Sequence, residues 1–385
     1  MNPDLVRRMH IWLEERRPEM TADLADFVAI ETPSTDKQRL DAAAAWLGEW
    51  VTRHLGAADA VIRTPGGTYG DTLQLGYPGT GQPVTLLCHY DTVWPAGTID
   101  EWPFRIEGSR ATGPGVFDMK AGLVQAVWAL RAAWECGAPT PPVRLLLNGD
   151  EEIGSPAARP LIEQACRDAA AVLVFESAAD GALKTARKGI GIYTVTTTGI
   201  EAHAGLDPTA GASAVAEMAR LICTLHELTD LEAGTTVNVG TVHGGTRSNV
   251  TAGRAVAEVD ARAASQAEAE KVNVAILGLS TTDHRVSVRV EGGWNRPVME
   301  RTQAVAEIFG LARTVASAIA LDLREASVGG GSDGNFAAAL GRPVLDGIGA
   351  VGAGAHARHE YVELDEMPRR AALAAGLLTA LANPS

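Results

Sequence analysis

The 385-residue chain has no excess of positive charge. Lys plus Arg number 33 and Asp plus Glu number 47, which gives a formal net charge of −14 at pH 7. Binding to nucleic acid requires basic side chains that neutralise phosphates, and docking on anionic lipid requires the same. The charge balance therefore argues against a nucleic-acid-binding protein and against a protein held on a membrane surface.

Paired cysteines and long apolar runs are also missing. The four cysteines are isolated in the sequence, and no CxxC pair occurs: Cys88, Cys136, Cys166 and Cys223. This spacing indicates neither a disulfide framework nor a cysteine-ligated zinc site. No apolar run approaches the ~20 residues of a membrane helix, and the charged N-terminal stretch is unlike a signal peptide. We therefore expect a cytoplasmic protein.

Two signatures of other enzyme classes are absent from the sequence. There is no GxSxG nucleophile elbow and no GxxxxGK[ST] phosphate-binding loop. Serine hydrolase and phosphoryl-transfer activities therefore have no support in the motifs. The hydrophobic fraction of 46% is ordinary for a globular protein, and the length suggests two or three domains.

What the sequence does contain is an alternation of short apolar runs with helical segments. The runs are VTLLC (84–88), VRLLL (143–147) and AVLVF (171–175). They are typical of strands buried on both faces of a parallel sheet. Helices are expected over 3–30, 41–55 and 119–136, and another after the second run, with Ser155 as N-cap and Pro156 at its first position. This alternation predicts an α/β domain.

From about residue 190 to residue 296 the pattern is different. Strands are expected at 190–199, 235–242, 253–262 and 284–292, and helices at 211–228 and 265–279. The order β-α-β-β-α-β is that of the ferredoxin-like split unit. Because the α/β pattern returns after Pro297, we expect residues 1–189 and 297–385 to form one α/β domain, with residues 190–296 inserted as an α+β domain.

Acidic and imidazole side chains follow the strands of the predicted α/β domain. They are His89 and Asp91 after the first run, Asp150, Glu151 and Glu152 after the second, Glu176 after the third, and His356 after a last strand-like segment. Ligands bind at the carboxyl ends of strands in open α/β sheets. Each feature alone also occurs as a solvated helix start or a surface residue, but their common position predicts one site.

Imidazole and carboxylate groups of this kind suit zinc and similar divalent ions. The set is too large for one four-coordinate ion and suits two ions about 3.5–4 Å apart that share a carboxylate. Asp118, in the glycine-rich turn GPGVFDMKAG, is the expected bridging ligand. Asp91 is well placed to accept the second imidazole N–H of His89.

These motifs resemble the M20 family of metallopeptidases, and within it the glutamate carboxypeptidase branch. The strings that carry the resemblance are LLCHYDTVWPAG, GPGVFDMKAG, NGDEEIGS, FES, GIEAHAG, GGTRSN and HARHEYVEL, spread over residues 84–370. The resemblance implies a dizinc exopeptidase-like catalytic domain with an inserted ferredoxin-like lid, which usually forms a dimer.

The resemblance also implies roles for single residues. His89 and Glu176 would bind one zinc, Glu152 and His356 the other, and Asp118 would bridge them. Glu151 would be the general base, and Asp91 would orient His89. His356 is preferred over His359 as the last ligand because Glu360 and Tyr361 follow it at the family's spacing.

The inserted domain and one glycine-rich loop would complete the site. His203, in AHAG rather than the commoner SHAG, would stabilise the oxyanion, typically in the neighbouring subunit. The substrate carboxylate would be held by Asn249, by Arg262 or Arg296, and by Gly330 and Gly331 of GGGSDGN. Trp94 and Trp102 either line a pocket for an aromatic or acyl group or serve only in packing.

The sequence thus predicts a cytoplasmic, dimeric hydrolase with two zinc ions, for which cobalt or manganese could substitute. It would cleave an amide bond next to a free carboxylate and release a C-terminal amino acid such as glutamate. An N-acyl-amino-acid deacylase, a dipeptidase or an aromatic aminohydrolase of the same family is the alternative. An inactive binding or assembly module is a more remote one.

Overall fold

The computed structural model describes residues 2–382, which form two compact units. The first unit comprises the described residues up to 186, residues 301–328 and those from 332 onward; the second comprises residues 187–300 and 329–331. The lid expected at 190–296 lies within the second unit. Residues 329–331, expected in the α/β domain, group with the second unit because Arg187 and Arg262 donate hydrogen bonds to their carbonyl oxygens.

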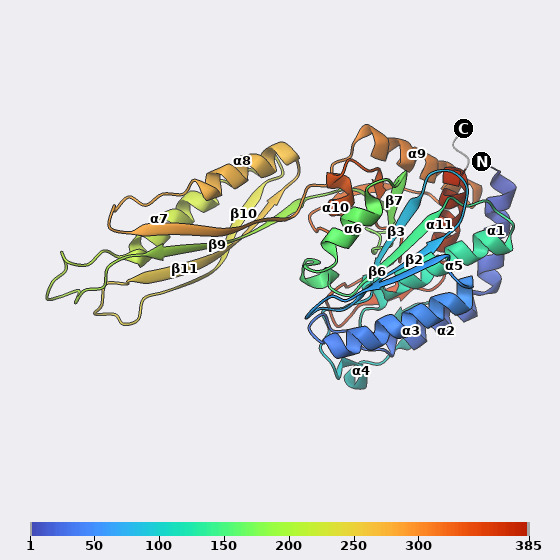
Figure 1. Ribbon diagram of the computed structural model, residues 1–385, viewed down its shortest axis with the longest axis horizontal. Helices are drawn as coiled ribbons and strands as arrows, with labels where there is room; N and C mark the ends of the chain where they lie inside the picture. The colour runs from blue at the N-terminus through green and yellow to red at the C-terminus, as the bar shows by residue number, and fades with distance from the viewer. Residues whose placement is uncertain (1, 383–385) are drawn as a thin grey trace. The chain divides into compact units, whose positions relative to one another are not determined.

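A six-stranded sheet runs through the first unit in the order β1-β2-β6-β3-β7-β14 (Figure 1). Its strands are β1 Ala60–Thr64, β2 Thr72–Tyr77, β3 Val84–His89, β6 Val143–Asn148, β7 Ala171–Val174 and β14 Val344–Leu345. Strands β6, β3, β7 and β14 are parallel, whereas β1 and β2 are antiparallel to their neighbours. The three apolar runs are thus adjacent strands and are almost wholly buried, as their unbroken hydrophobicity predicts.

Helices cover both faces of this sheet. The helices of this unit are α1 Pro3–Glu15, α2 Arg17–Val28, α3 Lys37–Leu55, α4 Thr98–Glu101, α5 Ala121–Glu135, α6 Arg159–Cys166, α9 Gln303–Ala318, α10 Gly334–Ala339 and α11 Glu366–Ala382. None of the helices in the described part of the chain is long and apolar enough to cross a bilayer.

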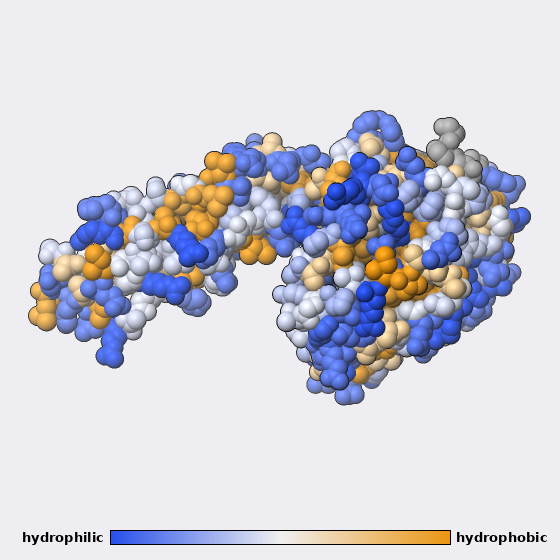
Figure 2. Space-filling model, in the orientation of Figure 1, coloured by the Kyte–Doolittle hydropathy of each residue, from blue (hydrophilic) through white to orange (hydrophobic). Residues whose placement is uncertain are grey.

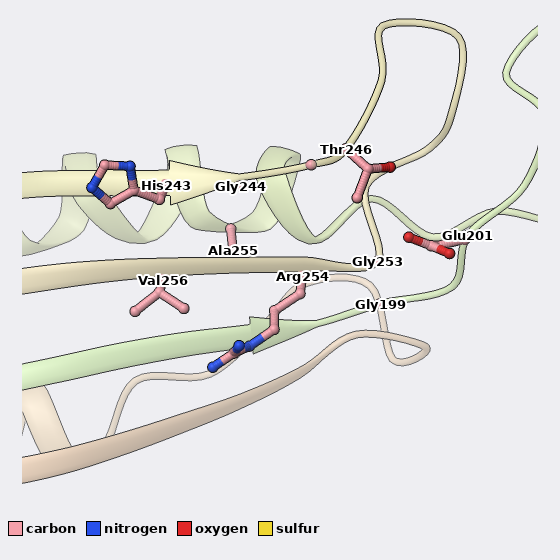
Figure 3. A pocket seen from close by; sticks show the side chains of 10 residues that line it. Gly199, Glu201, His243, Gly244, Thr246, Gly253, Arg254, Ala255 and Val256 are labelled. Atoms are coloured by element: carbon pink, nitrogen blue, oxygen red, sulfur yellow. The ribbon is translucent and has the colours of Figure 1, made fainter.

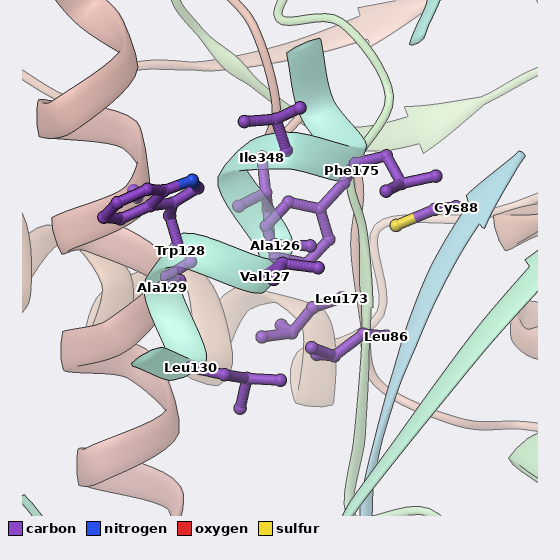
Figure 4. Close-up of a cluster of buried hydrophobic side chains, with 14 of the residues drawn as sticks. Leu86, Cys88, Ala126, Val127, Trp128, Ala129, Leu130, Leu173, Phe175 and Ile348 are labelled. Carbon is purple, nitrogen blue, oxygen red and sulfur yellow. The ribbon is translucent and has the colours of Figure 1, made fainter. Parts of the chain in front are cut away.

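The two faces are visible in consecutive residues of β3. Leu86 belongs to the buried cluster formed with Val127 and Leu130 of α5 (Figure 4). Thr85 points to the other face, where its hydroxyl donates to the Ala165 carbonyl oxygen of α6 at 2.8 Å. Because successive side chains of a strand point to opposite faces, α5 and α6 lie on opposite sides of the sheet. The sheet is therefore fixed between two helical layers.

Two helix boundaries differ from the sequence expectation. The helical region at 3–30 is two helices, α1 and α2, which meet at Arg16 just before Pro18. Helix α6 begins at Arg159 rather than at Pro156. Ser155 is not its N-cap, because the Asp150 carboxylate accepts the backbone N–H groups of residues 157 and 158 instead, at 2.7 and 3.2 Å. Asp150 thus orders the turn before α6, and none of the described side chains caps the helix itself.

Two smaller sheets complete the first unit. Strands β4 Arg105–Glu107, β5 Arg110–Thr112, β15 Gly352–Ala353 and β16 Tyr361–Glu363 form one sheet, and β8 Leu183–Arg187 pairs with β13 Glu325–Val328. The loop between β15 and β16 contains His356. Antiparallel pairing of these two strands fixes both ends of that loop.

The second unit has the ferredoxin-like order that its sequence predicts. Its elements are β9 Gly189–Thr198, α7 Ala214–His226, β10 Thr236–Gly244, β11 Arg254–Ala263, α8 Gln266–Leu277 and β12 Ser287–Arg296. The strands form an antiparallel sheet in the order β10-β11-β9-β12. Ser213 and Ser265 cap α7 and α8 through their hydroxyl oxygens. Strands β10 and β12 are the edges of this sheet.

Candidate metal centre

Three neighbouring parallel strands bring acidic and imidazole side chains to one edge of the large sheet. His89 is the last residue of β3, and Glu176 follows the end of β7. Glu151 and Glu152 occupy a single helical turn shortly after β6. Because β6, β3 and β7 point the same way, their carboxyl ends meet, as they do at ligand sites of other open α/β sheets.

Asp118 lies between two imidazole rings. Its Oδ1 is 3.4 Å from His89 Nε2, and its Oδ2 is 3.3 Å from His356 Nε2. His89 Nε2 is also 3.2 Å from Glu176 Oε1, and His356 Nε2 is 3.0 Å from Glu152 Oε2. The structure therefore brings together all five residues that the sequence analysis expected as ligands. They form two imidazole–carboxylate pairs that share the Asp118 carboxylate.

These residues fit a pair of divalent cations. Two ligands that each lie about 2.0–2.2 Å from a tetrahedral ion are about 3.3–3.6 Å apart, close to the separations observed. Ligand atoms of His89, Asp118 and Glu152 all lie within 4.8 Å of one another, and so do those of His89, Glu151 and Glu176. Among the described residues, His89 Nε2 and Glu152 Oε1 are buried side-chain atoms without a hydrogen-bond partner. Buried polar atoms are rarely left so, and a cation would satisfy both.

The electrostatics of the cluster also favour added positive charge. Burial and then the Asp118 carboxylate raise the pKa of Glu152 to about 7. Hydrogen bonds to Asp118 and Glu152 raise the pKa of His356 to about 10. Burial alone would raise the pKa of Asp118, yet the two histidines hold it well below its usual value. The carboxylates here repel one another and stabilise any cation between them.

The Asp91 carboxylate joins His89 to the Glu151–Glu152 turn. Its Oδ1 is 3.4 Å from His89 Nδ1 and accepts the backbone N–H of Glu151 at 3.1 Å. Its Oδ2 accepts the backbone N–H of Glu152 at 3.1 Å and the Ser34 hydroxyl at 2.8 Å. Asp91 thus orients the imidazole from the side opposite the cluster. Ser34 was not predicted, because nothing in a loop serine indicates so distant a partner.

Glycine and a strained histidine shape the two loops of the centre. At Gly115, φ is +71° and a Cβ would lie 2.5 Å from Thr92 Cγ2, so no other residue fits there. His356 has a φ of +61°, which is unusual for a side chain with a Cβ. In this conformation the ring of His356 lies beside Asp118, whereas His359, which is also exposed, forms no ion pair with the carboxylates of the centre in the described part of the chain. The geometry therefore favours His356 over His359 as the last candidate ligand, as the sequence spacing also did.

In the second unit, the segments of His203 and Asn249 lie side by side. The Ala204 N–H donates to the Asn249 carbonyl oxygen at 3.0 Å, and His203 forms a bridge with Val250. His203 Nδ1 accepts the backbone N–H groups of residues 205 and 206 at 3.2 and 3.1 Å. Its proton is therefore on Nε2, and the exposed ring is set to donate from that atom.

The glycine loop 329–331 is surrounded by arginines of the same unit. Arg187, which the sequence analysis missed, donates to the carbonyl oxygens of Gly330 and Gly331 at 3.1 and 3.0 Å. Arg262 is held by Asp260 through two hydrogen bonds of 2.8 and 2.9 Å. Arg296 is buried, and a Cβ on Gly331 would lie 3.1 Å from its Cγ. A side chain at position 331 would therefore have to displace that of Arg296.

Two further features lie outside the metal-site cluster. Trp94 and Trp102 pack edge to face, with ring centroids 5.1 Å apart, which supports a packing role for the two rings. An open hollow of about 470 Å³ lies on the second unit, between Glu201, His243 and Arg254 (Figure 3). Its polar side chains are all exposed, and we assign it no ligand.

Comparison with known proteins gives consistent results. The sequence pattern of Peptidase family M20/M25/M40 matches residues 85–380. Carboxypeptidase G2 from Pseudomonas sp. (strain RS-16) is 29% identical over 382 residues, covering 94% of this chain and 89% of that protein. Aminopeptidase PepT from Bacillus cereus ATCC 10987 has a TM-score of 0.78 at 22% identity, covering 95% of this chain and 99% of that one. The M20 family metallo-carboxypeptidase Sso-CP2 from Sulfolobus solfataricus has a TM-score of 0.71 at 19% identity, covering 94% and 99%. Both of these solved structures have the same fold as this chain.

Proposed function

The chain belongs to peptidase family M20/M25/M40, and on that premise we propose that it is a two-metal carboxypeptidase. As a member of this family it is a hydrolytic, metal-dependent enzyme. The observation that carries the proposal is the position of Asp118, whose two oxygens face two separate imidazole–carboxylate pairs. This arrangement is what two cations with a shared carboxylate require.

We assign His89 and Glu176 to one cation, and Glu152 and His356 to the other, with Asp118 as the bridge. Zinc fits the mixture of imidazole and carboxylate, and cobalt or manganese could replace it. Bound there, the cations would lower the pKa of a bridging water and polarise the carbonyl of the scissile amide.

The protein's own residues then carry the proton. Glu151 lies beside the His89–Glu176 pair, and Asp91 fixes its backbone N–H. We propose that the Glu151 carboxylate takes the proton of the attacking water and delivers it to the leaving amine. Glu152 cannot serve in the same way, because its carboxylate faces His356 at 3.0 Å.

Residues of the second unit would bind the substrate and its developing charge. The Nε2–H of His203 is a preorganised donor for the oxyanion that forms when water attacks. Asn249, whose backbone pairs with the His203 segment, would contact the substrate carboxylate together with Gly330. Either Arg262 or Arg296 would make the bidentate contact with that carboxylate.

The substrate we propose is a peptide or N-acyl amino acid with a free α-carboxylate, glutamate above all. The similarity to carboxypeptidase G2, which extends over 94% of the chain, supports this choice over deacylase, dipeptidase or aminohydrolase activity. These alternatives use the same cations and the same base, so the substrate panel described below separates them.

We propose that the second unit is the lid and that it forms a homodimer. Its edge strand β10 is largely exposed and leaves one row of backbone groups unpaired within the sheet. Figure 2 shows hydrophobic patches on the surface of this unit. Its exposed hydrophobic side chains include Ile192, Leu231 and Val274. A second copy pairing along β10 would cover this edge. The four unpaired cysteines suit the cytoplasmic location expected from the sequence.

Chelation followed by assay tests the function. We expect the protein treated with a chelator to lose hydrolysis of N-acyl and peptidyl glutamates, and added Zn²⁺ or Co²⁺ to restore it. In the replete protein, glutamate conjugates should be cleaved faster than dipeptides with a free amino group or acylated neutral amino acids. Full turnover in metal-free protein would overturn the two-metal assignment, and a preference for free dipeptides would replace carboxypeptidase with dipeptidase activity.

A further inference from the structure

We propose that Glu360 is a positioning residue of the metal centre, which holds the turn of Asp118 against the loop of His356. In the sequence, Glu360 marks only the spacing from His356, and none of the proposed catalytic steps involves it. The inference rests on the proposed function, since it assigns Glu360 to the same pair of cations.

A single buried carboxylate accepts four hydrogen bonds here. Glu360 Oε1 accepts the backbone N–H of Phe117 at 2.8 Å and that of Asp118 at 3.0 Å. Its Oε2 accepts the Gly115 N–H at 3.1 Å and the Trp94 indole N–H at 3.1 Å. The residue has 0% solvent exposure, so water does not compete for these contacts. A carboxylate so engaged fixes its neighbours firmly.

These contacts join the parts of the chain that hold the bridging ligand and the last ligand. Three of the donors belong to the turn that carries Asp118, and Glu360 itself closes the loop of His356, where its N–H donates to the Ala357 carbonyl oxygen at 2.9 Å. The separation of 3.3 Å between Asp118 Oδ2 and His356 Nε2 therefore depends on Glu360.

The far side of the same turn is anchored independently. The buried Lys120 ammonium donates to the carbonyl oxygens of Phe27 and Ile30 at 3.2 and 2.7 Å, and its backbone N–H donates to the Gly115 carbonyl oxygen at 3.0 Å. With Lys120 fixing one side, loss of Glu360 would release the side that faces His356. The expected defect is local and concerns the cation shared by Asp118 and His356.

The four donors explain why the side chain must be a carboxylate. All four are N–H groups, so both oxygens of residue 360 have to accept. Glutamine has the same shape, but its amide nitrogen would direct N–H groups at two of these donors. Glu360→Gln is therefore a nearly isosteric change that removes the positioning contacts.

The test is metal binding by Glu360→Gln, measured apart from turnover. Co²⁺ titration in the presence of a competing chelator gives the affinity of each site, and the visible Co²⁺ spectrum reports ligand geometry. We expect one of the two affinities to fall about 10- to 100-fold, the usual effect of removing a partner of a ligand, with an altered spectrum. Glu363→Gln is the matched control, because Glu363 on β16 contacts Arg110 and Ser109 instead. It should bind Co²⁺ as the wild type does.

The outcomes separate this inference from the proposed function. If the wild type binds fewer than two Co²⁺ ions, the proposed function fails. If the wild type binds two and Glu360→Gln binds both with unchanged affinity and spectrum, the positioning role is overturned. Should Glu360→Gln not fold, Trp94→Phe removes one of the four donors, and we expect it to weaken the same site about threefold. Wild-type affinity in Trp94→Phe would then overturn the proposal.

Discussion

Two adjacent glutamates of this centre have different surroundings and, we propose, different tasks. The Glu152 side chain is only 6% exposed and faces His356, whereas a carboxylate oxygen of Glu151 lies within 4.8 Å of the ligand atoms of His89 and Glu176. Asp91 binds the backbone N–H of both, so their relative placement is set by one carboxylate. We infer that the Asp91 carboxylate, by holding both backbone positions, lets the side chains of Glu151 and Glu152 serve different roles.

We therefore expect Glu151→Gln to bind metal normally and to lose catalysis. Removing a general base lowers kcat by about 100- to 10,000-fold, because the amide cannot accept the proton of the attacking water. Metal content by elemental analysis and kcat on an N-acyl glutamate measure the two effects. Glu163→Gln is the control, since Glu163 pairs with Arg159 on α6. A Glu151→Gln enzyme with the wild-type rate would rule out Glu151 as the base.

At the scale of single residues, the sequence predicted which residues lie at the site better than it predicted which residues they contact. His89, Asp118, Glu152, Glu176 and His356 were expected as ligands because imidazole and carboxylate groups stood where strands end, and the structure brings them together. Ser34, Arg187 and Glu360 were not expected. Each acts through a contact to a residue far away in the chain, and no local spacing encodes such a contact.

At the scale of elements, a polar network ties three helices of the first unit together. Asp23 on α2 accepts the Trp50 indole N–H of α3 at 3.0 Å and the Trp128 indole N–H of α5 at 2.8 Å. His54 Nε2 lies 3.2 Å from Asp23 Oδ2, and His54 Nδ1 lies 3.0 Å from an Arg131 guanidinium nitrogen. The two tryptophans are almost wholly buried, so the Asp23 carboxylate satisfies donors that would otherwise lack a partner.

This network should make stability depend on acid pH. Burial opposes ionisation of Asp23, but hydrogen bonds from His54, Trp50 and Trp128 outweigh it and hold the pKa of Asp23 below its usual value. A depressed pKa in the folded state adds stability above the unfolded value of about 3.9, and this contribution disappears as pH falls toward the folded pKa. At acid pH, the difference in free energy of unfolding between the wild type and a variant with an uncharged residue 23 should therefore decrease.

We expect Asp23→Asn to lower the free energy of unfolding by about 1–3 kcal/mol at pH 7. The difference from the wild type should shrink below about pH 4. Urea unfolding of both proteins from pH 3 to 7 measures it, and the metal centre contributes equally to each. Asp26→Asn, at an exposed position of the same helix, should differ little from the wild type throughout. A difference independent of pH would show that the Asp23 charge is not involved.

Element type was predictable where one pattern ran through the whole element. The buried runs at 84–88, 143–147 and 171–175 became β3, β6 and β7, since an unbroken apolar stretch of that length fits a covered parallel strand. Short strands such as β15 and β16 carry no pattern and depend on pairing with each other and with β5. The start of α6 was misplaced because Asp150, rather than Ser155, binds the free N–H groups before it.

At the scale of the whole molecule, the sequence shows an insertion but not how its residues reach the chemistry. His203, the proposed oxyanion donor, belongs to the second unit, whereas Glu151 and the proposed ligands belong to the first. The family resemblance implies that His203 acts in the site of the partner subunit, and we propose this for the dimer that the second unit would form. In a dimer with twofold symmetry, each subunit would supply one such histidine to the other.

Mixing two inactive variants tests this arrangement. Glu151→Gln retains His203, and His203→Ala retains Glu151, so each homodimer should be inactive. After the subunits are unfolded together and refolded, half of the dimers are hybrids, and one site of each hybrid has both Glu151 and the partner's His203. We expect recovery of about a quarter of wild-type activity for an equal mixture. If His203 acted within its own chain, each subunit would still lack one group and the mixture would stay inactive. Light scattering on the same samples establishes that hybrids are dimers, and a monomeric wild type would exclude the shared site.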